Sequence, residues 1–324
     1  MSAVAIVDAA GAQMGGAARY LDELRQYLRR TGREDVTVIG SRRRLDPRWL
    51  ARRELAGRAS GPGGRRIALN NVGFLMPGSQ RWTLLRNALH FLADGEEPEL
   101  DPPLRAAIRR DAAVVRYAAR RSDVLVTPSA GMAERVARAL PALRDRLVVR
   151  PHPVSPGTVP RLPREPAILC PVLFAPYKQM PAHLASLLAA LDAYGDPSLR
   201  LRVTAGEGEL PDAVARHPRM EPLGRLGHAE LRRWQARSRA FYFPSGLESF
   251  GYPLAEGRAS GRPVIAADTA HNREIAGPAL CGFTPGDGRS LLGALERALT
   301  ASIAPDPVPF DPGAYFGWLL GPRP

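Results

Sequence analysis

Short apolar segments alternate with longer amphipathic segments along the first half of the chain. Ala3–Asp8 is apolar and contains β-branched residues, a glycine-bearing loop follows, and Ala17–Arg30 places Tyr20, Leu21 and Leu24 on one helical face. This order predicts a strand, a tight loop and a helix, which is how a doubly wound α/β domain begins. Further strands are predicted at Val36–Ile39, Ile67–Asn71, Trp82–Asn87, Asp123–Thr127 and Leu147–Val149.

The polar stretches between these strands differ in character. Ser41–Gly64 is rich in arginine and glycine, which predicts a mobile loop with a short helix. Residues 102–121 predict an amphipathic helix with many arginines. Such a face is more often simply solvated, and the alternative is peripheral contact with an anionic membrane. Ser129 is expected to cap the helix that follows the strand at Asp123–Thr127.

A proline-rich segment divides the chain into two predicted domains. The N-terminal domain is expected to span residues 1–152, the linker 153–166 and the C-terminal domain 167–324. The second domain again alternates apolar runs with helical patterns, which predicts another parallel sheet covered by helices. Its strands are predicted at Ala167–Cys170, Leu199–Thr204, Ala240–Phe243, Val264–Ala266 and Phe283. Its helices are predicted near Ala182–Leu191, Ala229–Ala236, Leu254–Ala259 and Ser290–Leu299.

Composition narrows the class of protein. The 324 residues suffice for two ordinary domains. Cys170 and Cys281 lie in apolar runs without neighbours at metal-ligand spacing, so we expect free thiols, no metal site and a cytoplasmic protein. No signal peptide and no membrane-spanning run is expected. The net charge of +13 comes with a bias to arginine that is typical of a GC-rich genome, and no nucleic-acid reader motif accompanies it.

The stretch Phe243–Ala267, FPSGLESFGYPLAEGRASGRPVIAA, carries the chemistry. It predicts a strand, a tight loop, a helix that begins near Pro253, a turn and another strand. The free N–H groups of a helix N-terminus form a natural phosphate site. Glu248 and Glu256, with seven residues between them, cannot bind phosphate and are expected to face hydroxyl groups. A sugar nucleotide offers both a pyrophosphate and hydroxyl groups.

This stretch resembles the signature P-S-x-x-E-x-F-G-x-P-x-x-E-A of the retaining GT-B glycosyltransferases of family 4. The resemblance implies an α/β fold with two Rossmann-like, parallel-sheet domains facing each other across a cleft, with the acceptor on the N-terminal side and the donor on the C-terminal side. It further implies that Glu248 touches the donor sugar and that Glu256 holds the ribose hydroxyls. The other donor-binding residues of this stretch are Ser249, Phe250, Gly251, Tyr252, Pro253 and Leu254.

Three more places follow from the same resemblance. Lys178, the single lysine of the chain, aligns with a family lysine that neutralises the diphosphate, whereas Leu173 stands where the family has arginine. Gly224 and Arg225 lie in a loop that packs on the nucleobase in the family, and Arg225 is a candidate to replace the missing arginine. The remaining candidates are Gly15 and Gly16 near the donor, Asn87 near the reacting carbon, Arg86 at the usual histidine position, and His90 as a displaced acid–base group.

The activity implied is transfer of a sugar from a nucleotide-diphosphate sugar to an acceptor hydroxyl. It is retaining and metal-independent, and it needs no cofactor besides the nucleotide-sugar co-substrate. The acceptor is left open among a small bacterial metabolite, a glycan and a lipid. Two alternatives stay open: a GT-B sugar-nucleotide 2-epimerase, and a non-catalytic nucleotide-sugar-binding partner protein. Leu173, Arg86 and the short tail after Phe310 motivate the second alternative, because the family's last helix usually crosses back to the first domain.

Overall fold

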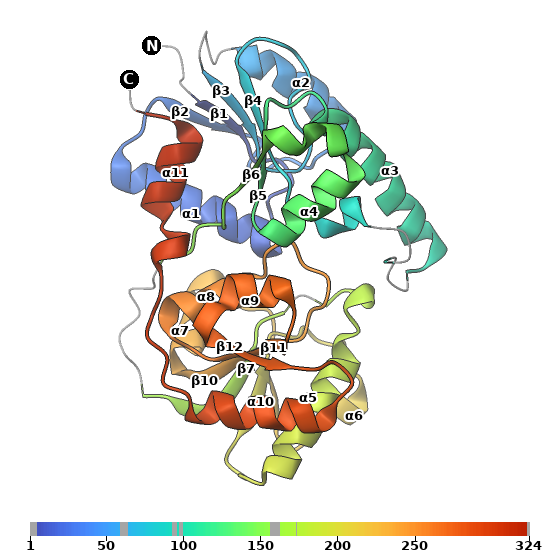
Figure 1. The fold of residues 1–324 in the computed structure, drawn as a ribbon, viewed down its shortest axis with the longest axis vertical. Coiled ribbons are helices and arrows are strands. Elements are labelled where there is room, and N and C mark those ends of the chain that lie inside the picture. Colours follow the sequence, from blue (N-terminus) through green and yellow to red (C-terminus); the bar gives the residue numbers. More distant parts are fainter. Residues whose placement is uncertain are drawn as a thin grey trace. The chain divides into compact units, whose positions relative to one another are not determined.

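The computed structural model describes residues 5–58, 64–92, 96, 100–155, 163–172 and 174–322. The chain forms two compact units. Unit 1 consists of Met1–Ser155, Glu248–Phe250 and Phe310–Pro324, and unit 2 consists of Pro156–Leu247 and Gly251–Pro309. Figure 1 shows a sheet flanked by helices in each unit. Both sheets are wholly parallel, which confirms the predicted α/β class.

Unit 1 is built on a six-stranded sheet with the order β2-β1-β3-β4-β5-β6. From β1 the chain first adds β2 on one side of the sheet and then adds β3 to β6 on the other side. The strand order therefore reverses between β1 and β3. Ligands of open α/β sheets bind outside the carboxyl ends of the strands at such a point. The strands are β1 (Ala5–Asp8), β2 (Val36–Ile39), β3 (Arg65–Ala68), β4 (Gln80–Leu84), β5 (Val124–Thr127) and β6 (Leu147–Val149).

Helices cover this sheet and bury the apolar stripes that the sequence predicted. Tyr20, Leu21 and Leu24 of the first helix are each at most 2% exposed. Ser129 caps its helix as predicted, because its hydroxyl accepts a hydrogen bond from the N–H of Met132 at 3.1 Å. The helices are α1 (Gly15–Thr31), α2 (Pro47–Gly57), α3 (Pro102–Ala119), α4 (Ala130–Ala139) and α11 (Pro312–Leu320).

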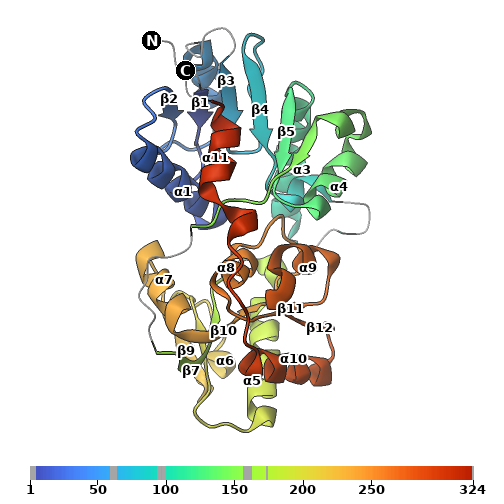
Figure 2. The same ribbon diagram turned by 60° about the vertical axis from the view of Figure 1, so that its left-hand side comes forward.

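The end of the chain belongs to unit 1, which corrects the predicted boundary at residue 324 of the second domain. Helix α11 lies beside α1 in both ribbon views (Figures 1 and 2), and the Tyr20 and Tyr315 rings pack edge to face at 5.8 Å. Arg65 of β3 donates to the carbonyl oxygens of Trp318 and Leu319 at 2.6 and 2.8 Å. The tail after Phe310 is therefore long enough for the helix that its length had put in doubt.

Unit 2 is built on the sheet order β12-β11-β10-β7-β8-β9, which reverses between β10 and β7. Its strands are β7 (Glu165–Cys170), β8 (Arg200–Val203), β9 (Met220–Pro222), β10 (Ser238–Phe243), β11 (Val264–Ala267) and β12 (Leu280–Phe283). Its helices are α5 (Met180–Tyr194), α6 (Asp212–Ala215), α7 (His228–Arg237), α8 (Tyr252–Ser260), α9 (Ala270–Ala276) and α10 (Gly288–Thr300). Apolar side chains of α5 and α10, among them Leu184, Leu187 and Leu295, join those of the sheet in one buried core.

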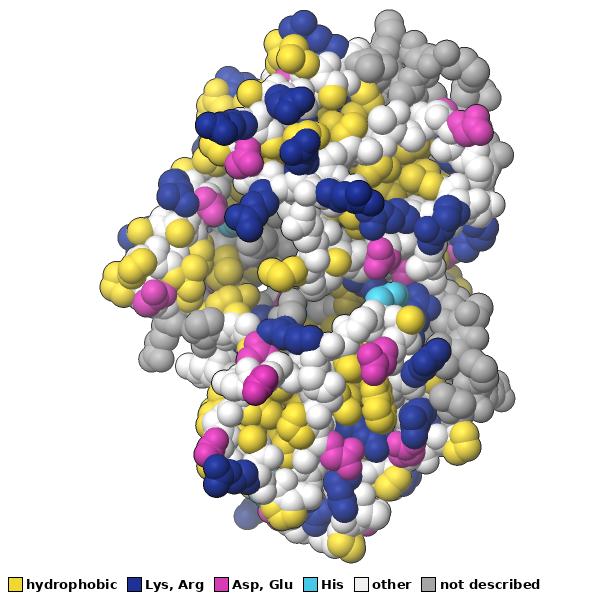
Figure 3. Space-filling model, turned by 180° about the vertical axis from the view of Figure 1, so that it is seen from behind, with side chains coloured by type: hydrophobic (Ala, Val, Ile, Leu, Met, Phe, Trp, Pro, Cys, Tyr) yellow, Lys and Arg dark blue, Asp and Glu magenta, His cyan; other side chains and the backbone are white. Residues whose placement is uncertain are grey.

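On one face of the molecule, the positive charge is scattered. On the face shown in Figure 3, basic side chains are spread widely and acidic ones stand among them. Helix α3 exposes Val114 and Tyr117 by 44% and 51% beside several arginines, and Arg121 lies over the Tyr117 ring at 4.3 Å. Contact of this face with an anionic membrane stays a prediction. No helix in the described part of the chain combines the length and apolarity needed to cross a membrane.

Candidate donor site

The loop between β10 and α8 positions the backbone of the signature stretch. Gly251 precedes α8 with φ of 80°, in the left-handed region, and a Cβ there would lie 2.9 Å from Leu254 Cδ1. Both constraints select glycine. No side chain caps the start of α8, and Pro253 in the first turn has no N–H to satisfy. The structure thus confirms the predicted tight turn into a helix whose N-terminus has a positive partial charge.

Glu256 lies one helical turn into α8. Its carboxylate is half-buried and accepts a hydrogen bond of 2.5 Å from Nε2 of Gln235 on α7. The neutral amide of Gln235 orients the Glu256 carboxylate without adding a charge that would neutralise it. Sequence reasoning did not single out Gln235, because nothing in the spacing between α7 and α8 shows that the two side chains meet.

Lys178 lies after β7, the strand beside β10 in the sheet. It ends the short 3-10 helix Pro176–Lys178 and is half-buried. Burial raises the pKa of the nearby Cys170 thiol, and the positive charge of Lys178 opposes that rise. The thiol of Cys170 is consequently a packing group of the core. Leu173, where the second family cation is absent, lies outside the described residues.

The loop after β9 holds Gly224 and Arg225. Gly224 has φ of 72°, which explains a glycine at that place. The Arg225 guanidinium forms an ion pair with Glu209, and its Nε would lie 3.2 Å from a Cβ on Gly206. Glu209 also accepts a hydrogen bond from the N–H of Gly206 at 2.5 Å. Arg225 is therefore held by a carboxylate that sequence reasoning missed, and part of its charge is already compensated.

In unit 2, these residues lie where the fold favours a ligand. Lys178 follows β7 and Gly251 follows β10, and the sheet order reverses between these two neighbouring strands. Because all strands are parallel, the loops that follow them leave from one edge of the sheet. Lys178, Gly224, Arg225, Gly251–Leu254 and Glu256 all belong to unit 2.

Glu248, Ser249 and Phe250 belong to unit 1 instead. Ser249 donates its hydroxyl hydrogen to the Arg86 carbonyl oxygen at 2.7 Å, and its own carbonyl accepts from the Ser129 hydroxyl at 2.9 Å. The Phe250 ring packs edge to face against His152 at 5.0 Å and is 2% exposed. Ser249 and Phe250 were predicted to bind the donor. In the structure their side chains, and the carbonyl of Ser249, are instead used in packing and hydrogen bonds within unit 1.

Gly15 and Gly16 form the exposed first turn of α1. No side chain caps this turn, and Gly15 has φ of 56°. The turn follows β1, at the point where the sheet of unit 1 reverses its order. These observations agree with a glycine loop that leaves backbone N–H groups accessible.

Asn87 and His90 form a pair after β4. Asn87 caps a 3-10 turn by accepting from the N–H of Leu89 at 3.1 Å, and its Nδ2 lies 3.2 Å from His90 Nε2. Burial lowers the pKa of His90 to about 4, with smaller and opposing effects from the charges of Asp111 and Arg116. The imidazole is thus neutral at pH 7. It accepts a proton poorly, which weakens the case for His90 as the displaced acid–base group.

Asp8 was not singled out by sequence reasoning, although it ends β1 at the same edge. It is fully buried, and its Oδ2 accepts from Arg53 Nη1 at 2.6 Å and from Asn70 Nδ2 at 2.8 Å. Trp49 Nε1 donates to the other oxygen at 3.0 Å. Trp49 and Arg53 belong to α2, so this network fixes a helix to the edge of the sheet where only a mobile loop with a short helix was predicted.

The comparisons with known proteins agree with this geometry. Residues 167–301 match the family model described as glycosyl transferases group 1. None of the curated proteins matches the chain.

Solved structures resemble the fold over most of the chain. A sucrose-phosphate synthase from Thermosynechococcus elongatus is 15% identical, with a TM-score of 0.63 over 98% of this chain and 94% of the other. A UDP-forming trehalose-phosphate synthase from Burkholderia xenovorans is 12% identical, with a TM-score of 0.62 over 99% and 98%.

A structure of S. aureus TarM, in complex with fondaparinux, α-GlcNAc-glycerol and UDP, is 12% identical with a TM-score of 0.54. The match covers 78% of this chain and 50% of TarM, so the chain spans about half of that protein's length. The chain therefore has the two-unit GT-B fold of these structures, and residues 167–301, within unit 2, match the glycosyl transferases group 1 model.

Proposed function

We propose that the protein transfers a sugar from a nucleotide-diphosphate sugar to an acceptor hydroxyl, with retention of the anomeric configuration and without a metal ion. The observation that carries this proposal is the start of α8, a helix N-terminus without a side-chain cap that lies one turn before the carboxylate of Glu256. One turn of helix advances about 5.4 Å. A diphosphate at the N-terminus would therefore place a neighbouring ribose within reach of Glu256.

Cations near the same strand ends would stabilise the leaving group. When the bond between the sugar and the nucleotide breaks, negative charge develops on the β-phosphate, and stabilising such charge is usually the largest catalytic contribution. Lys178 is proposed for this role, and Arg225 is proposed to assist it. Because Arg225 is ion-paired with Glu209, its contribution depends on how far that pair yields to the diphosphate.

The residues of unit 1 complete the proposal. Glu248 is assigned to the donor sugar, Gly15 and Gly16 to the donor phosphates and sugar, and Asn87 to the reacting carbon. The backbone of Gly251–Leu254 is assigned to the diphosphate, with Ser249 and Phe250 contributing as anchors of the loop. Gly224 is assigned to the nucleobase.

The proposed reaction needs no enzymic nucleophile. The acceptor oxygen attacks the anomeric carbon on the face from which the diphosphate leaves, so one carbon–oxygen bond forms as the other breaks. The acceptor proton passes to the departing phosphate oxygen. Because its pKa is lowered, His90 is a weak base, which agrees with a mechanism in which the departing phosphate of the substrate accepts the acceptor proton. The assignment of the donor-binding residues does not depend on which group accepts this proton.

The relatives suggest where to begin the search for the donor. TarM is described with UDP and α-GlcNAc-glycerol, and the trehalose-phosphate synthase is described as UDP-forming. UDP and UDP-sugars are therefore the first ligands to test, with GDP- and dTDP-sugars beside them. The acceptor class is left to screening of small metabolites, glycans and lipids.

Thermal unfolding with each nucleotide tests donor binding. A ligand at about 100 times its Kd stabilises the native state by about 2.7 kcal/mol, so one nucleotide should raise the melting temperature clearly. Glu256→Ala should lose most of that rise, whereas Glu296→Ala, on the exposed side of α10, should keep it. If no nucleotide raises the melting temperature of the unmodified protein, the proposal fails.

Product analysis separates transfer from the two alternatives. Glu248→Ala should retain nucleotide binding and lose transfer, because its proposed contact is with the sugar. Epimerised nucleotide sugar formed without an acceptor would favour the 2-epimerase. Tight nucleotide binding with no transfer to any acceptor in the screen would favour the binding protein. The crossing of α11 into unit 1 removes one of the three reasons for that last alternative.

A further inference from the structure

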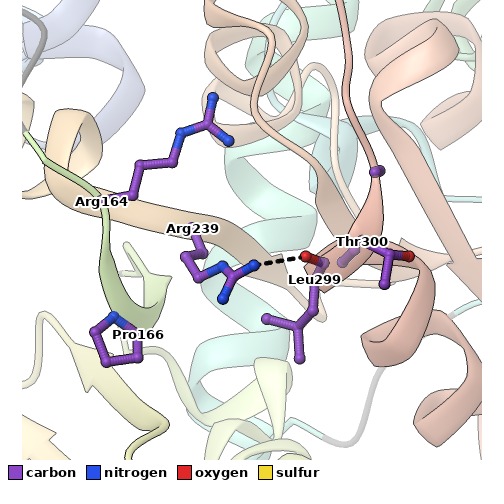
Figure 4. A pocket seen from close by; sticks show the side chains of 7 residues that line it. Arg164, Pro166, Arg239, Leu299 and Thr300 are labelled. Carbon is purple, nitrogen blue, oxygen red and sulfur yellow. Dashed lines mark hydrogen bonds between the residues drawn. The ribbon is translucent and has the colours of Figure 1, made fainter.

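A pocket of about 330 Å³ lies at the amino end of the unit 2 sheet, the edge opposite the loops that follow β7 and β10. Arg164 and Pro166, at the start of β7, form one wall, and Arg239 at the start of β10 lies beside them. Leu299 and Thr300, at the end of α10, form the other side (Figure 4). Its size lies at the lower end of the range for small-ligand pockets.

The pocket originates in an irregularity of the sheet. β7 and β10 are neighbours in the middle of the sheet, and their register shifts between the pair Ser238–Glu165 and the pair Ala240–Ile168. Pro166 lies within this shift and has no N–H to donate, which confines proline in a central strand to such irregular places. A bulge re-aims the side chains around it. On β10 the register shift falls at Arg239, between Ser238 and Ala240, and the side chain of Arg239 is exposed.

Two arginines line this pocket, a third lies near one of them, and none of the three is held by an ion pair among the described residues. Arg164 and Arg239 line the pocket. The pKa of Arg262 is lowered mainly by burial and further by the nearby charge of Arg164. Among the described residues, none of the three forms an ion pair, and Arg164 has no hydrogen-bond partner either. The Nε of Arg262 is buried and has no hydrogen-bond partner. The group is therefore a concentration of positive charge that no ion pair among the described residues balances, and the carbonyl end of α10 offsets only part of it.

Two acidic residues could balance these arginines, and both are engaged elsewhere: Glu165 is next to Arg164 in the sequence, and the charge of Arg239 acts on Asp196. Side chains alternate along a strand, so Glu165 points away from the face shared by Arg164 and Pro166. Its carboxylate pairs with Arg202 and Arg237. Asp196, whose pKa is lowered mainly by hydrogen bonds to Ser198 and only weakly by Arg239, is bound to the Ser198 hydroxyl at 2.7 Å.

A structural role accounts for Arg239 but not for Arg164. Arg239 Nη2 donates to the Leu299 carbonyl oxygen at 2.8 Å, the dashed bond in Figure 4, which satisfies a carbonyl in the last turn of α10. That bond uses one of its five N–H donors. Arg164, which also lines the pocket, makes no such contact with the residues that the structure describes.

We propose that this pocket binds the phosphate group of a small ligand between Arg164 and Arg239, with Arg262 adding charge behind them. The planar guanidinium fork matches the geometry of phosphate oxygens, and two arginines can engage one phosphate from two sides. The site lies in unit 2 at the sheet edge away from the donor site, so it does not depend on the function proposed above. The phosphate could belong to a soluble phosphorylated metabolite or to a lipid headgroup.

Calorimetric titration with inorganic phosphate and with glycerol phosphate tests the site. We expect Arg164→Gln to weaken binding about tenfold, the effect of losing one charged hydrogen bond, and the double variant with Arg239→Gln to weaken it further. Arg233→Gln, which removes an exposed charge from α7, is the matched control and should bind as the unmodified protein does. Arg164→Gln loses no native contact, so a folding defect cannot imitate the result.

A further variant separates this pocket from the donor site, which also binds phosphate under the proposed function. Lys178→Gln should leave phosphate binding by the pocket unchanged. Loss of binding in Lys178→Gln together with retention in Arg164→Gln would overturn the proposal, as would absence of binding by the unmodified protein at millimolar phosphate. Sedimentation with phosphatidylglycerol vesicles, against phosphatidylcholine vesicles, then identifies the source. A loss in Arg164→Gln on vesicles alone indicates a headgroup, and a loss with glycerol phosphate indicates a soluble ligand.

Discussion

Arg53 and Asp8 form an ion pair in which the side chains are 1% and 0% exposed. Removing one partner leaves an uncompensated charge in the interior, which costs about 3–5 kcal/mol. We therefore expect Arg53→Met to lower the melting temperature of unit 1 strongly. Arg52→Met, the exposed neighbour on the same helix, should have little effect. Thermal unfolding followed by circular dichroism makes the comparison, and equal melting temperatures of the two variants would contradict the assigned role.

His90 links stability to pH at another single residue. Its pKa is about 4 in the folded protein, mainly through burial, against 6.5 for an ordinary histidine. Between these values the unfolded chain binds a proton that the folded chain does not, so stability falls as the pH is lowered through this window. The shift corresponds to roughly 3 kcal/mol.

The test compares urea unfolding of His90→Gln with that of the unmodified protein from pH 7.5 to pH 4. The variant should lose less stability over this window, while the contribution of His152, whose pKa burial also lowers, stays in both proteins. Parallel pH profiles for the two proteins would show that His90 is protonated in the folded state as easily as in the unfolded one.

At the scale of elements, α8 depends on a glycine in its middle. A Cβ on Gly257 would lie 2.1 Å from Val264 Cγ2 and 3.0 Å from the Arg262 carbonyl oxygen. Helix α8 and β11 are thus packed at backbone distance, and α8 carries Glu256. Gly257→Ala should destabilise unit 2 by about 1–3 kcal/mol through overpacking.

Gly293 on α10 offers the matched control, since the nearest atom to a Cβ there is Arg297 Nη1 at 3.5 Å. Alanine is the better helix former by about 1 kcal/mol, so Gly293→Ala should raise the stability slightly. Urea unfolding of the two variants should therefore show shifts of opposite sign. A stabilised Gly257→Ala would mean that α8 and β11 are not held this closely.

Two edge strands of the unit 1 sheet have the predicted bounds. Val36–Ile39 and Leu147–Val149 are only partly buried, but each is a short run rich in β-branched residues between polar loops, which is a local signal for a strand. The strand Met220–Pro222 and the helix Asp212–Ala215 were not predicted, since three or four residues show no period. Helix α2 was predicted only as part of a mobile loop, because the burial of Arg53 depends on a partner 45 residues away in the sequence.

The part of the candidate site that lies in one short stretch of sequence could be predicted. The turn at Gly251 and the start of α8 follow from local rules for glycine and proline, so the structure confirms them. The groups that orient the site residues were not predictable, because Gln235 for Glu256 and Glu209 for Arg225 meet them only through tertiary packing. The same holds for the anchoring of Ser249 by Ser129, since 120 residues separate them.

At the scale of the whole molecule, unit 1 is assembled from both ends of the chain. Residues 1–155 form its sheet, and residues 310–324 supply α11. The rings of Tyr20 and Tyr27 on α1 pack against Phe316 at 5.5 and 5.3 Å, and Arg33 donates to the Gly321 carbonyl oxygen at 3.0 Å. The apolar face of α1 is therefore complete only when the C-terminal segment is in place, whereas the sheet of unit 2 is continuous in sequence between β7 and β12.

This asymmetry predicts a local effect for a substitution near the C-terminus. Phe316 is fully buried, so Phe316→Ala should cost about 3–5 kcal/mol. Because Phe316 packs in unit 1, we expect hydrogen exchange to accelerate in α1 and β1, while the amides of β7 to β12 keep their protection. Val308→Ala, at a side chain that is 79% exposed, should change neither set. If Phe316→Ala accelerates exchange equally in both sheets, the units unfold as one, and the tail stabilises the whole molecule. If α1 stays protected, the packing of α11 against it contributes little to the fold.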